Sequence, residues 1–305
     1  MKILRFNDDR LGVLKGADRV VDISAVISHR EERGPQRTME VLIENFDALR
    51  ADIQRIVDSA DGAPLASVRL LAPVPRPSKC LGAFLNYLDQ DDRSVATLPN
   101  EFFHKAPELL GPEGNIILRD IPQVKEVTPE AELAFVIGKH GKDVPEDRAM
   151  DYVFGYVPYF DISARGLIRR SLVVPKGQDT FGPCGPWIVT KDEIPDPHNL
   201  NVKSWVDGGL RQDFNTKDMA HKIPDQIAWL SKYLQLQPGD VIATGTHHRG
   251  LAPLNVGNVL EIEIEKIGRA RWNVTGQMPY KFPKKNSDER KPDPLPPGMN
   301  ITPVA

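Results

Sequence analysis

The amino-acid sequence predicts an α+β fold in which β-strands dominate, preceded by a smaller N-terminal unit. Three observations predict it. Strand-like patterns prevail in the central part of the chain, and a helical spacing of apolar residues is clear in only two stretches. The proline-rich segment 73–78 interrupts regular structure and acts as a linker between the two units. At 305 residues the chain is long enough for a large core plus a smaller unit.

The N-terminal unit, residues 1–72, is expected to be a small α+β domain with two short strands and a helix. Ile3–Phe6 and Gly12–Leu14 are short strand-like runs. A helix is expected to follow, because apolar residues then recur every three or four positions and mark one face. These residues are Met39, Leu42, Ile43, Phe46, Leu49, Ile53 and Ile56. The unit shows no pattern that suggests chemistry.

The central unit, residues 79–276, is expected to hold the main sheet structure. Apolar residues alternate with three glutamates over residues 260–265, which indicates a strand with one solvated face. A helix is expected over residues 224–234, where apolar residues lie on one side. Residues 277–305 are rich in Pro, Lys and Asp and offer too little apolar surface for a core, so a flexible tail is expected there.

Composition and charge exclude several classes of protein. The net charge is −3, with acids and bases interspersed, so neither a nucleic-acid partner nor a polybasic membrane signal is expected. No apolar run approaches the roughly 20 residues of a membrane helix, and the N-terminus lacks a signal-peptide pattern. A cytoplasmic location is therefore expected. Cys80 and Cys184 make no disulfide framework and are expected to be small core residues.

The feature with most chemical meaning is the pair Glu130 and Glu132, followed later by Asp161. Alternate side chains of a strand share a face, so the two glutamates project together. Two adjacent carboxylates repel, so either one takes a proton or a cation lies between them. With a third acid from another strand they would form an all-oxygen site that Mg²⁺ or Mn²⁺ accepts. The alternative is a solvated strand face, as expected for residues 260–265.

The sequence around these acids resembles the fumarylacetoacetate hydrolase superfamily from about residue 79 to about residue 274. The order and spacing of several motifs carry the resemblance, whereas any one of them would be weak. The motifs are residues 85–89 (LNYLD), 102–107 (FFHKAP), 130–133 (EAEL), 151–156 (DYVFGY), 161–165 (DISAR), 176–183 (KGQDTFGP), 185–187 (GPW) and 237–246 (QPGDVIATGT).

The resemblance implies a fold, a cofactor and an assembly. The fold would be a mixed β-sandwich or roll with a small N-terminal domain, and residues 79–276 would be the catalytic domain. Relatives are usually homodimers. A single Mg²⁺ or Mn²⁺ ion would bind to the carboxylates of Glu130, Glu132 and Asp161 and chelate a small 1,3-dicarbonyl or 2-oxo acid, which is the expected partner.

The resemblance also implies residues that contact the substrate. Arg165 would bind a substrate carboxylate, although a surface ion pair is the alternative for it. Lys176 would face the substrate, where its ammonium could stabilise an enolate; the alternative is an ion pair with Asp179. Three further residues are expected to line the substrate pocket: Tyr87, Gly245 and Thr246.

The chain departs from the family pattern near the substrate. Many relatives carry a His–Glu dyad that activates water, where this chain has Gln90 and Arg93. Glutamine cannot act as a base near neutral pH. A glutamine of some relatives is Ile168 here. Conversely, His247 and His248 follow the last motif, and either could supply a relocated base or be a solvent-exposed loop histidine. The candidate catalytic residues are therefore Lys176, His248, His247 and Gln90.

Two classes of function follow. The first is a metal-dependent enzyme on a small oxo acid, and hydrolytic C–C bond cleavage of an acylpyruvate-like compound through a metal-bound enolate ranks first. Because the His–Glu dyad is absent, a tautomerase, decarboxylase or hydratase on a 2-oxo or enol acid is the alternative. The second class is a catalytically inactive binding protein of the same fold.

Overall fold

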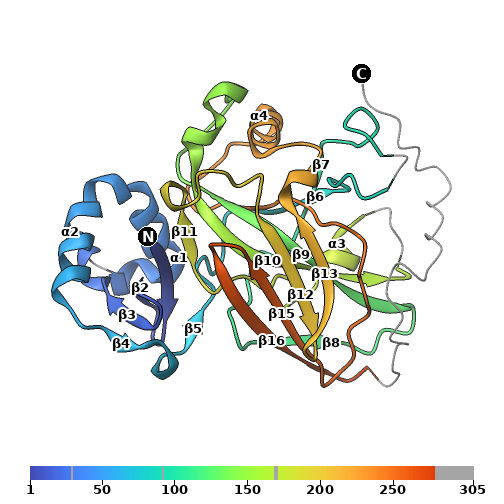
Figure 1. Cartoon of the computed structure of the whole chain (residues 1–305), viewed down its shortest axis with the longest axis horizontal. Coiled ribbons are helices and arrows are strands. Elements are labelled where there is room, and N and C mark those ends of the chain that lie inside the picture. Colours follow the sequence, from blue (N-terminus) through green and yellow to red (C-terminus); the bar gives the residue numbers. More distant parts are fainter. Residues whose placement is uncertain (29, 91–92, 168–170, 279–305) are drawn as a thin grey trace.

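The computed structural model describes residues 1–28, 30–90, 93–167 and 171–278. Over these ranges the strands form an 11-stranded sheet and a 5-stranded sheet, with few helices (Figure 1). The larger sheet runs β4-β3-β2-β1-β11-β10-β9-β14-β6-β7, and β5 pairs with β1. Its strands are β1 (Lys2–Phe6), β2 (Arg10–Lys15), β3 (Arg19–Asp22), β4 (Ala63–Pro64), β5 (Leu70–Leu71), β6 (Cys80–Phe84), β7 (Glu101–His104), β9 (Glu126–Ile137), β10 (Val153–Arg165), β11 (Ile188–Thr190) and β14 (Val241–Ala243).

The smaller sheet covers one face of the larger one. Its order is β13-β12-β15-β16-β8, and β12, β15 and β16 lie against β9 and β10. Figure 1 shows these strands crossing in front of β9 and β10. The α+β, β-rich class predicted from the sequence is therefore confirmed. The strands are β8 (Asn115–Leu118), β12 (Asn201–Val206), β13 (Gly209–Asn215), β15 (Val259–Ile264) and β16 (Gly268–Gly276).

Four α-helices occur in the described ranges. The stretch predicted as one N-terminal helix is two, because the chain breaks helical geometry at Asn45. Its apolar face is correct: Met39, Leu42 and Ile43 are buried, as are residues of the second helix. The helix predicted over residues 224–234 is confirmed within one residue. The helices are α1 (Arg30–Glu44), α2 (Phe46–Ser59), α3 (Val173–Lys176) and α4 (Ile223–Tyr233).

The N-terminal strands belong to the large sheet. β1 pairs with β11 through Lys2 and Val189, and β11 pairs with β10. The sheet therefore continues from the first residues to the strands that carry the acids. The division of the chain at residues 73–78 stays a prediction, and the predicted tail lies outside the described residues beyond residue 278.

The two faces of β9 enter different cores. Leu133, Phe135 and Ile137 pack into the core between the two sheets, with residues of β15 and β16. Ala134 and Val136 point the other way and join the core that includes residues of α1 and α2. Because alternate residues share a face, Glu130 and Glu132 lie on the side of Ala134 and Val136, away from the smaller sheet.

One parallel pair interrupts the antiparallel arrangement around β9. β14 pairs antiparallel with β9 and parallel with β6, with Ala243 opposite Gly82. Parallel neighbours end at the same edge of a sheet. The segments that follow β6 and β14, which contain the motifs of residues 85–89 and 244–246, therefore leave the sheet side by side.

The expectations for the two cysteines and for the strand over residues 260–265 are confirmed. Cys80 and Cys184 are free and buried. β15 has a buried apolar side, and its glutamates face solvent fully or in part. None of the helices in the described ranges has the length and apolar content needed to cross a membrane.

Candidate active site

Glu130 and Glu132 of β9 and Asp161 of β10 form one buried cluster. The antiparallel register places Asp161 directly opposite Glu130, and directly paired residues share a face of the sheet. One carboxylate oxygen from each residue lies within 4.8 Å of the others. The side chains are almost inaccessible, since the three residues are 5%, 1% and 0% exposed. The structure therefore brings together the three acids that the sequence singles out.

Three cations compensate this cluster. The Lys176 ammonium bridges Glu130 Oε2 at 2.8 Å and Asp161 Oδ2 at 2.5 Å. The Lys105 ammonium binds Asp161 Oδ1 at 2.5 Å. Arg165 pairs with the remaining oxygen of Glu130 and donates from Nε to Thr128 Oγ1 at 3.0 Å. The three cations thus pair with Glu130 and Asp161, and none of them pairs with Glu132 among the described contacts.

The sequence left a structural ion pair open as the alternative role of both Lys176 and Arg165, and these contacts bear on it. Lys176 is buried, and its partners are Glu130 and Asp161, whereas Asp179 pairs with Arg119 at 3.1 Å. The ion pair of Lys176 with Asp179 is therefore absent among the described contacts. Arg165 does form an ion pair, but with a buried acid of the cluster rather than at the surface.

Charge and burial shift the pKa values of the two glutamates in opposite directions. Burial raises the pKa of Glu130, but the charges of Lys176 and Arg165 outweigh it and hold that pKa well below its usual value. For Glu132, burial and the charges of Asp161 and Glu130 all act in one direction and raise the pKa well above its usual value. The Gly245 N–H, which donates to Glu132 Oε2 at 2.8 Å, compensates only part of this effect. Glu132 is the carboxylate that lacks an ion-pair partner among the described contacts.

The donor set fits a hard divalent cation. All three side chains offer carboxylate oxygens, the ligands that Mg²⁺ and Mn²⁺ accept. A dication would also relieve the repulsion felt by Glu132. Glu130, Glu132 and Asp161 are the residues that would hold it, and their role as ligands stays a prediction.

The segment after β14 runs on beside β9 and supports the cluster. Thr244 N–H donates to Leu133 O at 3.0 Å, and Thr246 Oγ1 donates to Ala131 O at 2.7 Å. Between them Gly245 has φ of +89°, and a Cβ there would lie 3.1 Å from Asn86 Cβ. Glycine therefore suits this position, because its N–H must reach Glu132 while the backbone passes close to the neighbouring loop.

Gln212 of β13 fastens this segment to β9. It is 1% exposed. Its Oε1 accepts from Ala131 N–H at 3.0 Å, and its Nε2 donates to Thr246 Oγ1 at 2.9 Å and to His247 O at 2.7 Å. The Thr246 hydroxyl, expected to line the substrate pocket, is thus engaged by Ala131 and Gln212 in this structure.

Tyr87 is buried in the segment after β6. Its ring packs edge-on against Phe214 with centroids 5.3 Å apart, and burial raises the pKa of its hydroxyl. The neighbouring Asn86 amide donates to Thr244 O at 2.9 Å. These contacts hold the two segments that follow β6 and β14 together.

The four candidate catalytic residues occupy different environments. Lys176 lies within the acid cluster, as described above. Gln90 is exposed, and its side chain makes no hydrogen bond to the carboxylates within the described ranges. His247 stacks on Phe214, with ring centroids 5.8 Å apart, and burial lowers its pKa. His248 Nδ1 lies 2.7 Å from Asp89 Oδ2, beside Arg93. Ile168 lies outside the described residues.

Sequence reasoning gave no role to Lys105, Asp89 or Gln212. The first two stand within quoted motifs, FFHKAP and LNYLD, so their presence there was a usable signal. A lone glutamine such as Gln212 gives no local signal, because its partners are distant in the chain.

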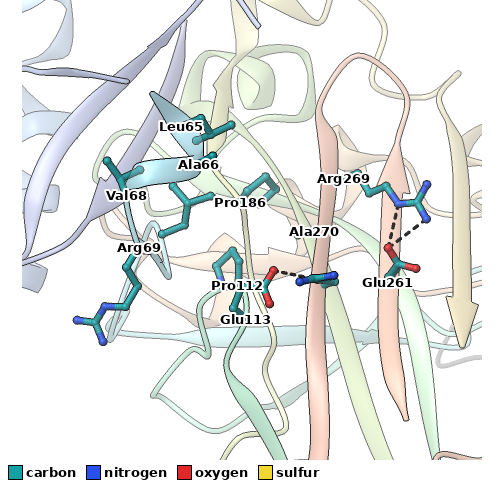
Figure 2. Close-up of a pocket in the computed structure, with 12 residues that line it drawn as sticks. Leu65, Ala66, Val68, Arg69, Pro112, Glu113, Pro186, Glu261, Arg269 and Ala270 are labelled. Atoms are coloured by element: carbon teal, nitrogen blue, oxygen red, sulfur yellow. Dashed lines mark hydrogen bonds and ion pairs between the residues drawn. The ribbon is translucent and has the colours of Figure 1, made fainter. Parts of the chain in front are cut away.

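A separate hollow is lined by residues outside the acid cluster. It measures about 480 Å³ and lies between residues 65–70, residues 112–113 and strands β15 and β16. Figure 2 shows Arg269 paired with Glu261, and Glu113 with a second arginine of β16. None of the clustered acids lines it, and its two glutamates are both paired with arginines, so the chemistry is assigned to the carboxylate cluster.

Comparison with known proteins places these features in context. A family model described as fumarylacetoacetate (FAA) hydrolase, C-terminal, matches residues 79–275. The maleylpyruvate hydrolase of Aquipseudomonas alcaligenes is 36% identical over 283 residues, covering 88% of this chain and 97% of that protein. The mitochondrial oxaloacetate tautomerase of Xenopus laevis is 35% identical over 287 residues, covering 88% of each protein.

Solved structures give the same result. The maleylpyruvate hydrolase from Sphingobium sp. SYK-6, in complex with manganese(II) and pyruvate, is 37% identical. It superposes with a TM-score of 0.82, covering 90% of this chain and 99% of that one. A fumarylacetoacetate hydrolase from Exiguobacterium antarcticum gives a TM-score of 0.75 at 29% identity, covering 91% of this chain and all of that one. The fold type expected from the sequence resemblance is confirmed.

Proposed function

The chain belongs to the fumarylacetoacetate hydrolase family and is an enzyme of that family, and from this premise we propose that it hydrolyses a C–C bond of an acylpyruvate-like compound with a divalent metal ion. The observation that carries the proposal is the buried cluster of Glu130, Glu132 and Asp161 beside Lys176 and Arg165. The cluster supplies oxygen ligands for a cation, and the two bases supply positive charge for an anionic substrate.

Arg165 and Lys176 have distinct roles in this proposal. Arg165 binds the substrate carboxylate through its guanidinium, because its side chain is 23% exposed and therefore accessible. Lys176 holds its proton, because the charges of Asp161 and Glu130 outweigh burial and raise its pKa. Its ammonium stabilises the enolate that develops as the C–C bond breaks. When bound, Mg²⁺ or Mn²⁺ supplies Lewis-acid polarisation of the substrate oxygens.

Support for this substrate class comes from two relatives. One is a maleylpyruvate hydrolase at 36% identity, and another of that name was solved with manganese(II) and pyruvate. Pyruvate is the product that hydrolysis of any acylpyruvate releases. The same support favours a manganese or magnesium cofactor for this chain. A homodimer, a catalytic unit of residues 79–276 and a cytoplasmic location complete the proposal.

Tautomerisation of a 2-oxo acid is the second candidate. Gln90 and Arg93 replace the residues with which relatives activate water, and Gln90 is exposed. Enol–keto exchange needs no activated water, so this replacement would not impair it. A relative at 35% identity is an oxaloacetate tautomerase. Decarboxylation and hydration draw on the same enolate chemistry and are tested alongside.

The test begins with metal content. Protein stripped with a chelator and reloaded with Mg²⁺ or Mn²⁺ is assayed on acetylpyruvate by loss of the ultraviolet absorbance of its enol, and on oxaloacetate by enol–keto exchange and by decarboxylation. Glu132→Gln should lose metal affinity and turnover together. Glu263→Gln is the matched control, because Glu263 belongs to the exposed glutamate pattern of β15. Equal metal content and rate in the Glu132 variant and the wild type would contradict the proposal.

A further inference from the structure

Asp89 and His248 form a close pair between the segments that follow β6 and β14. Asp89 Oδ2 lies 2.7 Å from His248 Nδ1 and accepts the His248 backbone N–H at 2.6 Å. The other oxygen of Asp89 pairs with Arg93. The Asp89 side chain is 0% exposed, whereas the His248 side chain is 28% exposed. A buried, fully bonded carboxylate thus holds a histidine that reaches solvent.

The contacts assign the proton on the imidazole. Burial raises the pKa of Asp89, but the hydrogen bond and charge of His248 outweigh burial and lower it to about 2. An ionised carboxylate only accepts hydrogen bonds, so Nδ1 must donate. Arg93 also lies 3.4 Å from Nδ1, but a guanidinium has no acceptor atom, and the shorter contact with Asp89 decides the arrangement. In the neutral ring, Nε2 is then the basic nitrogen.

The fold explains why two residues so far apart in the chain meet. Asp89 lies five positions after Phe84, the last residue of β6, and His248 lies five positions after Ala243, the last residue of β14. β6 and β14 are parallel neighbours, with Ala243 paired with Gly82, so the two segments leave the same edge of the sheet in the same direction. Gly245, three positions before His248, donates its N–H to Glu132 Oε2 at 2.8 Å, so the loop that carries His248 begins at the cluster.

His247 is a poorer candidate for the same task. Its ring stacks on Phe214 at an interplanar angle of 24°, and its Nδ1 accepts the Arg249 N–H at 3.3 Å. No carboxylate is hydrogen-bonded to it among the described contacts. The two adjacent histidines therefore differ in kind, and the sequence pattern alone does not separate them.

We propose that His248 is the general base of the reaction and that Asp89 is the residue that positions it and fixes its tautomer. The inference rests on the proposed function and names the group that replaces the dyad missing at Gln90 and Arg93. Arg93 itself has become part of the support, because its Nη1 pairs with the Asp89 oxygen that does not bind His248.

The proton transfer balances within the proposed hydrolysis. His248 Nε2 takes a proton from water, and the water oxygen bonds to the acyl carbon while the carbonyl pair moves onto its oxygen. That pair then reforms the carbonyl as the bond between the acyl carbon and the methylene carbon breaks, and the electrons of the broken bond remain on the methylene carbon as the enolate of pyruvate. The proton on Nε2 passes to this carbon. Pyruvate and a carboxylic acid leave, and the histidine is neutral again.

The test compares Asp89→Asn, His248→Gln and His248→Ala in the metal-loaded protein. We expect the first two to lose about 10²–10⁴ in kcat with KM within a few-fold of wild type. Imidazole in the buffer should restore part of the activity of His248→Ala, which a structural role would not allow. Nitrogen NMR of the histidine rings should show an Nδ1-protonated ring that His248→Gln removes and Asp89→Asn converts to the other tautomer.

Asp225→Asn is the matched control. Asp225 also binds a histidine, His221 Nδ1, at 2.6 Å, but at the first turn of α4. Removing this carboxylate should leave kcat unchanged. All variants are checked for metal content and Tm, so that loss of the site is separated from loss of the base.

The outcomes separate the two proposals. If His248→Gln keeps kcat within about threefold of an active wild type, the base assignment is wrong while the proposed function stands. If Asp89→Asn keeps both kcat and the tautomer, the positioning role is wrong. Losses accompanied by lower metal content or Tm, and not restored by imidazole, would make the pair structural and overturn the inference. A wild type inactive on acylpyruvates and 2-oxo acids would refute the proposed function itself.

Discussion

Replacing Glu132 with glutamine should stabilise the metal-free protein and weaken the metal-bound one. Glu132 is buried beside Glu130 and Asp161, and both charges raise its pKa along with burial. Glutamine keeps the shape and removes the charge. The same carboxylate would become favourable once a dication binds, so the substitution should have opposite effects in the two states.

The size of the effect follows from the geometry. At the 4.8 Å limit that separates the ligand oxygens, two unit charges repel by about 3.5 kcal/mol at an effective dielectric of about 20. The Lys176 charge offsets part of this repulsion, so a net gain of about 1–3 kcal/mol is expected for the metal-free variant. At about 2 °C per kcal/mol for a chain of this size, its Tm should rise by about 2–6 °C.

The stability that Glu132→Gln gains over the metal-free wild type should increase as the pH rises. The raised pKa means that the folded protein keeps a proton on Glu132 after the unfolded chain has lost it, above the ordinary value of 4.5. Stability due to this proton is complete below that value and is lost as pH rises through the folded-state pKa. Wild type and Glu132→Gln should therefore have similar Tm near pH 4.5 and differ most at alkaline pH.

Thermal unfolding with and without metal measures both effects. A cation at 100 times its Kd stabilises the wild type by about 2.7 kcal/mol, and the variant should lose most of that gain. Glu263→Gln should follow the wild type in both states, because Glu263 is exposed. The reasoning is refuted if metal-free Glu132→Gln is no more stable than wild type at alkaline pH, or if metal stabilises both equally.

Three further predictions test other parts of the site. Lys176→Met should cost about 10²–10³ in rate in the metal-loaded enzyme, and it should also lower the Tm of the metal-free protein, because it leaves the acids it bridges without its charge; an unchanged metal-free Tm would argue against the bridge. Gln90→His alone should leave Tm unaltered, since the residue is exposed. Adding Arg93→Glu should lower Tm, because it places a second carboxylate beside buried Asp89. A double variant of normal Tm with increased hydrolysis would show that the missing dyad limits the enzyme. Gly245→Ala should destabilise by about 1–2 kcal/mol, because φ is +89° there, and wild-type denaturant stability would contradict this.

Local patterns in the sequence predicted what depends on local geometry. The position of Glu130 and Glu132 on one face follows from the two-residue period of a strand, and the buried face of α1 and α2 follows from helical spacing. The break between these helices at Asn45 was missed, because the apolar face continues through it. A change of helix axis leaves little trace in a periodic pattern.

Long-range contacts were accessible only where the family motifs pointed to them. Asp161 was expected beside Glu130 from the resemblance, and the register of β9 and β10 provides the physical reason. The pair of Asp89 and His248 spans 159 positions and depends on the parallel pairing of β6 with β14, which no local pattern indicates. The union of β1 with β11 likewise depends on contacts between distant residues.

The parallel pair β6 and β14 also bears on how such enzymes diverge. Two loops that leave adjacent parallel strands in the same direction deliver side chains to one neighbourhood, so a catalytic group can migrate from one loop to the other while the substrate stays in place. A column-by-column alignment would record this as a loss at one position and an unrelated gain at another. Searches for function in this family gain from treating the two loops as one composite position and asking what their side chains supply jointly.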